Sequence, residues 1–245
     1  MKKRIQIGML LAFLSLWAGA GILHADDRFL WRSWGVREGL AETYSYAVSI
    51  APGGSAYIRH GSVLSMSVFD GYGITRIPDP RGSAQVDFPS TKRVYAGAAG
   101  TLWTTSLDAL LEYRDGKWTV RYTPPAGRQV LAAVPAGRRV MVLLQDGLRE
   151  FDPDQRRLRD IRTGENSRIA PFLAMCPGAA GELYITGEHG LAKVHIPPDG
   201  GAFEWLEVDS GANRITHFEH PLPGTGELFA QGISAPGKRR VIVRW

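Results

Sequence analysis

The chain has 245 residues, of which 44% are hydrophobic and 22% are charged, with 29 glycines and 15 prolines. This is the composition of a globular protein, and it excludes disordered and collagen-like chains. The formal net charge is +5, but three of the 29 basic residues, Lys2, Lys3 and Arg4, lie in a segment that we expect to be removed. The remaining 26 basic and 24 acidic residues leave +2 with no basic run. A nucleic-acid partner is therefore not expected.

The first 25 residues have the pattern of an export signal. Three basic residues precede an apolar stretch that ends in Leu23-His24-Ala25, and two aspartates follow. Cleavage after Ala25 fits best, cleavage after Ala20 is an alternative, and an uncleaved anchor is another because the stretch is almost long enough to span a bilayer. We predict a signal peptide or signal anchor at 1–25, a mature domain at 26–245, and a periplasmic or extracellular location.

Short apolar or alternating runs, separated by clusters of Gly, Pro and Asp, dominate the mature part, and long helical periodicity is missing. This pattern predicts many short β-strands. One strand recurs with spacings of 46, 38, 43 and 45 residues between its first residues. Its five copies are Ala56–Ile58, Leu102–Thr104, Val140–Val142, Leu183–Ile185 and Leu228–Ala230.

Each copy has further strands around it. Tight turns with Asp and Gly, such as Asp70-Gly71 and Asp115-Gly116, separate the third and fourth strands. These residues suit two-residue hairpins, which need positive φ angles and side chains that bond their own backbone. The first strands are predicted at 46–50, at 85–88 or 93–95, and at 130–134, 172–175 and 215–218. The third strands are predicted at 68–69, 111–113, 149–151 and 192–194, and the fourth at 74–77, 118–122, 158–161 and 203–208.

Four antiparallel strands in about 43 residues correspond to one propeller blade. We predict an all-β fold, a β-propeller of four-stranded antiparallel blades, with about five blades visible. The last blade has three strands, at 215–218, 228–231 and 240–244. It is either incomplete, so that 26–245 is the N-terminal part of a longer ring, or closed by the N-terminal strand Phe29–Trp34.

Three segments resemble the two-component regulator propeller family. They are Gly100–Tyr113 (GTLWTTSLDALLEY), Gly181–Leu191 (GELYITGEHGL) and the opening Trp31–Leu40 (WRSWGVREGL). The resemblance implies the extracytoplasmic sensor portion of a bacterial membrane receptor. Such receptors are often histidine kinases or hybrid kinases and sometimes diguanylate cyclases, and some members sense carbohydrate breakdown products. It also implies rings that typically have seven blades.

We therefore predict a sensor domain that binds a ligand without catalysis. The alternatives are a free periplasmic or secreted propeller that acts as a protein-binding scaffold, and a carbohydrate-active enzyme. The expected partner is a small polar ligand, with an oligosaccharide as one candidate. Membrane attachment, through a C-terminal continuation or an uncleaved signal, and a homodimer are further expectations, whereas no cofactor is expected.

No residue is predicted to be catalytic or to bind a metal ion. His217 and His220 form the only local cluster of metal ligands, and on a strand their odd spacing points them to opposite faces. The segment Gly224–Gly226 lacks the third glycine and the strand-to-helix setting of a dinucleotide-binding loop. Cys176 is the only cysteine, which excludes an internal disulfide, and we interpret it as a free buried thiol.

Candidate binding residues lie in the loops that join the second and third strands of each blade. Binding residues concentrate on loops over a rigid scaffold, and equivalent loops of a closed propeller gather on one face. Solvated turn residues are the alternative interpretation for any one of them. The candidates are Arg59, His60, Ser106, Asp108, Gln145, Asp146, Glu188 and His189.

Four aromatic residues recur at one position of the repeat. They are Tyr57, Trp103, Tyr184 and Phe229. Adjacent blades must bury one face of each sheet, so we predict that these side chains form the core between blades rather than a stacking platform for a ligand.

Overall fold

The computed structural model divides the chain into two units, Met1–Gly35 and Val36–Trp245. It describes residues 32–51, 53–82, 93–178, 181–197 and 201–208, and the backbone of three strands between 214 and 244. The export signal predicted at 1–25 lies outside the described residues. Within the described part, no helix has the length and apolar character needed to cross a membrane.

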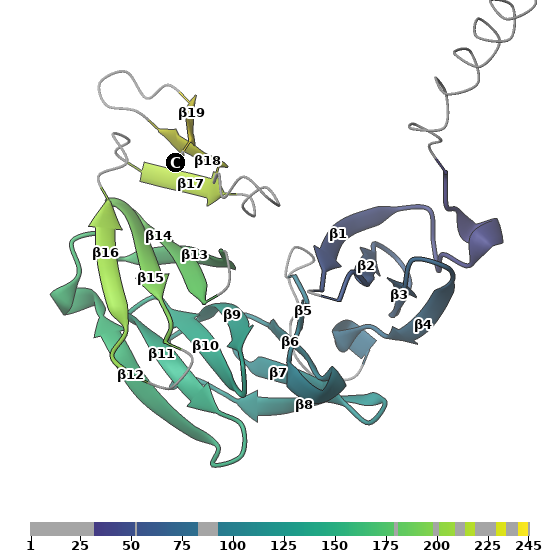
Figure 1. Cartoon of the computed structure of the whole chain (residues 1–245), viewed down its shortest axis with the longest axis horizontal. Coiled ribbons are helices and arrows are strands. Elements are labelled where there is room, and N and C mark those ends of the chain that lie inside the picture. Colours follow the sequence, from purple (N-terminus) through teal and green to yellow (C-terminus); the bar gives the residue numbers. More distant parts are fainter. Residues whose placement is uncertain are drawn as a thin grey trace, which may run out of the picture. The chain divides into compact units, whose positions relative to one another are not determined.

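Unit 2 is a β-propeller with four four-stranded antiparallel blades, and in each blade the strands follow chain order (Figure 1). Blade one contains β1 (Ser45–Ile50), β2 (Ala56–His60), β3 (Ser65–Phe69) and β4 (Ile74–Pro78). Blade two contains β5 (Tyr95–Ala96), β6 (Leu102–Thr105), β7 (Leu110–Arg114) and β8 (Lys117–Tyr122). Blade three contains β9 (Val130–Ala136), β10 (Arg139–Leu144), β11 (Gly147–Asp152) and β12 (Arg157–Thr163). Blade four contains β13 (Phe172–Pro177), β14 (Glu182–Gly187), β15 (Gly190–His195) and β16 (Glu204–Val208).

A fifth sheet has three strands, β17 (Arg214–Phe218), β18 (Phe229–Ile233) and β19 (Arg240–Arg244). The predicted all-β propeller with four-stranded blades is therefore confirmed, and the described residues of the last sheet form three strands. Closure by an N-terminal strand stays a prediction, because Arg32–Trp34 belong to no strand and 29–31 lie outside the described residues. The sequence predicts the first strand of blade two at 85–88 or at 93–95. The observed strand, Tyr95–Ala96, overlaps the second of these ranges, and 85–88 lie outside the described residues.

The core lies between successive blades. Trp103 of blade two is 2% exposed and packs with Val140, Val142 and Phe151 of blade three. The Trp103 and Phe151 ring centroids are 6.1 Å apart in an edge-to-face arrangement, a geometry that favours aromatic pairs. A second cluster joins Met141 of blade three to core residues of blade four, and a third joins blade one to blade two.

The repeated aromatic position behaves largely as predicted. Trp103 and Tyr184 are buried, and Tyr57 is partly buried against the cluster that joins blades one and two. The side chain of Phe229 lies outside the described residues. The interpretation of this position as inter-blade core is thus confirmed for Trp103 and supported for Tyr57, whereas Tyr184 is buried but belongs to none of these three clusters.

The hairpin turns have the chemistry that their residues predict. Asp115 and Gly116 both have positive φ angles, 53° and 82°, as a type I′ hairpin requires. The Asp70 carboxylate accepts hydrogen bonds from the backbone N–H groups of Tyr72 and Gly73, at 2.9 and 2.8 Å. These two bonds lower the pKa of Asp70.

Two ends of the blades can be distinguished. Because all strands are antiparallel, the connections between second and third strands lie at the same end as the connections that lead to the next blade; we call this the turn end. The connections between first and second strands, and between third and fourth strands, lie at the opposite end, which we call the hairpin end.

Candidate functional site

A charged cluster lies at the turn end of blade three. The Asp146 carboxylate lies 2.7 Å from Arg128 Nη1 and 3.1 Å from Arg149 Nη2, and Arg149 Nε donates to Asp160 Oδ1 at 2.6 Å. Burial disfavours the charged form of Arg149, but the bond to Asp160 and the nearby charge of Asp146 raise its pKa above the ordinary value. Among the described residues, Asp146 Oδ1 is buried without a hydrogen-bond partner.

Backbone hydrogen bonds fix this turn against the segment that leads into blade four. Gly164 N donates to Asp146 O at 2.8 Å, and Phe172 N donates to Gln145 O at 3.4 Å. The side chain of Gln145 is exposed. The turn therefore presents an exposed amide beside a carboxylate whose position is set by two arginines.

In blade two the two predicted residues, Ser106 and Asp108, are hydrogen-bonded to each other within the loop. Ser106 is fully buried, and its hydroxyl donates to Asp108 Oδ1 at 2.6 Å. Asp108 is exposed. The Asp108 side chain is therefore accessible to a ligand, and the Ser106 side chain is not.

In blade four the predicted pair lies in the β14–β15 turn. The backbone N–H groups of Glu188 and His189 donate to Pro171 O at 3.0 Å and Ile169 O at 3.3 Å. Glu188 is partly buried and His189 is exposed. The backbone of this turn is thus held in place while the His189 side chain is accessible to solvent.

The predicted loop placement of Arg59 and His60 is wrong, because both belong to strand β2 and are buried at 1% and 0% exposure. Arg59 forms a bidentate pair with Asp79, in which Nε and Nη2 each lie 3.1 Å from a carboxylate oxygen. Arg81 Nε lies 2.9 Å from the same carboxylate. Burial raises the pKa of Asp79, but the two guanidinium groups outweigh this effect and hold it below the ordinary value.

His60 is hydrogen-bonded on both ring nitrogens. Nε2 lies 2.8 Å from Ser67 Oγ and Nδ1 lies 3.3 Å from Ser45 Oγ. Burial lowers the pKa of His60 in spite of smaller opposing effects. The neutral form is therefore the one that this site favours.

We expect His60 to make the fold less stable in mild acid. Because its pKa in the folded state lies below the unfolded value, about 6.5, protonation below that pH favours the unfolded chain. The urea midpoint of the wild-type chain should fall between pH 7.5 and pH 5.5, and H60Q should reduce that fall. An equal fall in both chains would contradict this role for His60.

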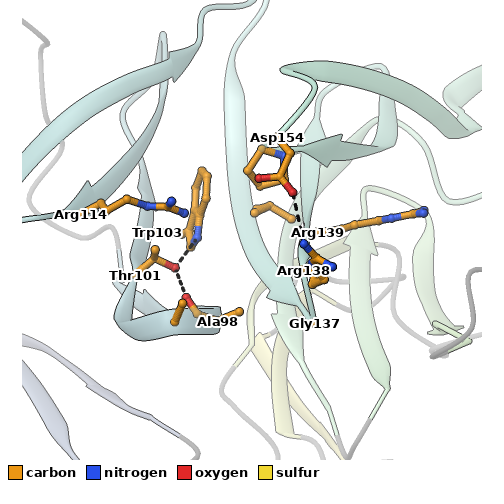
Figure 2. Close-up of a pocket in the computed structure, with 11 residues that line it drawn as sticks. Ala98, Thr101, Trp103, Arg114, Gly137, Arg138, Arg139 and Asp154 are labelled. Atoms are coloured by element: carbon orange, nitrogen blue, oxygen red, sulfur yellow. Dashed lines mark hydrogen bonds and ion pairs between the residues drawn. The ribbon is translucent and has the colours of Figure 1, made fainter.

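A pocket at the hairpin end was not predicted. It lies between blades two and three, has a volume of about 200 Å³ and is lined by eleven residues. Figure 2 shows Trp103, Thr101 and Arg114 on one side, and Arg138, Arg139 and Asp154 on the other. Trp103 Nε1 donates to Thr101 Oγ1 at 3.2 Å, and this hydroxyl donates to Ala98 O at 2.8 Å.

Solved structures share this propeller fold. One is the extracellular domain of a protein described as the hybrid two-component system BT3049 from B. thetaiotaomicron, with 14% identity, a TM-score of 0.50, and coverage of 86% of this chain and 31% of that one. Another is streptogramin B lyase, with 14% identity, a TM-score of 0.51, and coverage of 81% and 68%. A third is PorZ, a surface component of the type-IX secretion system of Porphyromonas gingivalis, with 13% identity, a TM-score of 0.52, and coverage of 87% and 36%.

No family model matches the sequence, and no curated protein matches it. The chain spans about a third of the two-component system domain to which it is similar. At identities of 13–14% these likenesses establish the β-propeller fold. Because sensor and enzyme propellers both share it, the fold by itself assigns neither activity.

Proposed function

We propose that this chain is a ligand-binding sensor propeller of a bacterial signalling receptor of the two-component type, located outside the cytoplasm. It binds a small polar ligand at the turn end and carries out no chemistry on it. A bound ligand favours one position of the propeller relative to the receptor segment that follows it. This change of position would pass the signal on to the rest of the receptor.

The observation that carries this proposal is the fixed polar surface at the turn end. Arg128 and Arg149 hold the Asp146 carboxylate through Oδ2, and 39% of this side chain is exposed. Gln145 lies beside it, and Asp108 and His189 are exposed in the equivalent turns of the neighbouring blades. Donors and acceptors on a rigid scaffold suit the hydroxyl groups of a sugar, because little side-chain entropy is lost on binding.

We expect the double substitution E188A/H189A to weaken ligand binding while leaving the fold intact. Both side chains lie in a turn whose backbone is held by Pro171 and Ile169, so their loss removes polar contacts and not core packing. Calorimetric titration with a panel of neutral and acidic disaccharides should show an affinity at least about tenfold lower than wild type for the best member.

The matched control for this experiment is E204A/H195A. These two residues are cross-strand partners at the hairpin end of the same blade, and both are exposed. The control removes the same side-chain types from the other end. Unchanged affinity in a folded E188A/H189A chain, or an equal loss in the control, would remove the β14–β15 turn from the binding site.

Catalysis is the competing function, and an assay separates it from binding. Among the described residues no group of three or more His, Cys, Asp or Glu side chains could hold a metal ion, but carboxylate chemistry needs no metal. The chain should leave each bound disaccharide unchanged after prolonged incubation. Release of new reducing ends that depends on Asp108 or Asp146 would replace binding with catalysis as the function.

A further inference from the structure

The pocket at the hairpin end is walled by positive charge. Arg114, Arg138 and Arg139 line it together with a single acidic residue, Asp154. Arg114 comes from β7 of blade two, and the other two arginines come from the β9–β10 hairpin of blade three. The guanidinium groups of Arg114 and Arg138 thus lie on either side of one small cavity, whereas the Arg139 side chain extends away from it (Figure 2).

The buried glutamate beneath the pocket does not cancel this charge. The Glu112 carboxylate is buried and pairs with Arg114 at 2.8 Å and Arg121 at 3.0 Å. Glu150 pairs with Arg139 and, at 2.6 Å, with Arg159, but it lies on the other face of blade three, because it is opposite Met141, which packs against blade four. The negative charge of Glu112 is shared by two arginines, which leaves a net charge of +1 on the blade-two side of the pocket, and Arg138 and Asp154 balance each other on the blade-three side.

The pair at the rim of the pocket is weak. Arg138 Nη2 lies 3.7 Å from Asp154 Oδ2, and the two side chains are 89% and 73% exposed. Exposed ion pairs contribute little to stability. The Arg138 guanidinium can therefore leave Asp154 for a ligand at little cost.

We propose that this pocket binds the oxyanion group of a small ligand, either a carboxylate or a phosphate. Guanidinium groups match both anions because their N–H groups form planar, charge-assisted pairs of hydrogen bonds. The volume of about 200 Å³ is below the range of about 300–1,000 Å³ typical of drug-sized ligands. It suits a single acidic group or one acidic sugar ring. This site lies at the opposite end of the blades from the turn-end site and does not depend on it.

The test is calorimetric titration of the full chain with three probes: glucuronate, inorganic phosphate and glucose. Glucuronate, phosphate or both should bind, and which of them binds identifies the source of the anion. Glucose should not bind in this pocket, since it has the ring without the charge. In R138Q the affinity for the bound anion should fall about tenfold, and in R138E further. Arg138 is almost fully exposed, so both variants should fold as the wild type does.

The control is R37Q, which removes the positive charge of an exposed residue. Arg37 belongs to the 3₁₀ turn Val36–Glu38, which precedes blade one in the sequence. It should leave the affinity unchanged. Three results would overturn the proposal: no binding of either anion at millimolar concentration, glucose binding that R138Q weakens equally, or the same loss of affinity in R37Q and R138Q. The last would indicate attraction to overall charge and not a site. Because the proposed sensor ligand is tested with turn-end variants, failure here leaves that function standing.

Discussion

Replacement of Trp103 by alanine is expected to lower the free energy of unfolding by about 3–5 kcal/mol. Trp103 is 2% exposed and lies in the cluster that joins blades two and three, edge-to-face with Phe151. Removing the indole leaves a cavity at this interface, and the surrounding β-strands can relax only in part. Urea unfolding followed by circular dichroism measures the change.

The control for W103A is Y72A. Tyr72 is an aromatic residue in the β3–β4 turn with 92% exposure, so its loss should change the free energy of unfolding by less than about 0.5 kcal/mol. If W103A cost as little as Y72A, the Trp103 side chain would not be part of the core, and stacking on a ligand would become the better interpretation.

Loss of the Asp79 charge should be about as damaging, about 3–5 kcal/mol for D79N. The substitution removes the negative charge with which Arg59, which is 1% exposed, pairs at 3.1 Å. Arg81 also loses its partner at 2.9 Å. Urea unfolding at pH 7 is again the measurement.

A double variant and a pH series separate the charge effect from packing. R59M/D79L removes both charges of the pair and should recover part of the stability lost in D79N. Because the folded state holds the pKa of Asp79 below its ordinary value, the contribution of this charge is present above about pH 4 and is lost as the pH falls further. The gap between wild type and D79N should therefore narrow in acid. A gap that stays constant down to pH 2 would contradict this assignment.

The strands could be predicted because their signals are local. Alternating apolar residues and Asp or Gly turns repeat about every 43 residues, and the described strands lie where the repeat places them. The side-chain network of blade one could not be predicted in this way. Strand β2 includes Arg59 and His60. Asp79, which neutralises the buried charge of Arg59, is 20 positions away in the sequence.

The sites were harder to predict for the same reason. The ion pair between Arg128 and Asp146 joins two connections that are separated in sequence and meet only at the turn end of the folded blade. The pocket at the hairpin end is assembled from the segments around Thr101, Arg138 and Asp154, which belong to two blades. Neither arrangement has a contiguous motif, so the repeat indicates which turns share an end but not which charges become neighbours.

A charged position that recurs in the third strands also bears on how such a chain could gain or exchange blades. Glu112, Glu150 and Lys193 stand at the same register of the third strand, opposite Trp103, Met141 and Tyr184. Each is neutralised by ion pairs within its own blade, including that of Lys193 with Glu182 at 2.7 Å. Between blades the contacts are mainly apolar, and apolar contacts tolerate substitution when volume is conserved. A duplicated or transplanted blade would thus bring its own counter-charges at this position, even where the sign is reversed, and would have mainly shape to match at its borders, beside a few polar contacts such as that of Arg162 with Glu207.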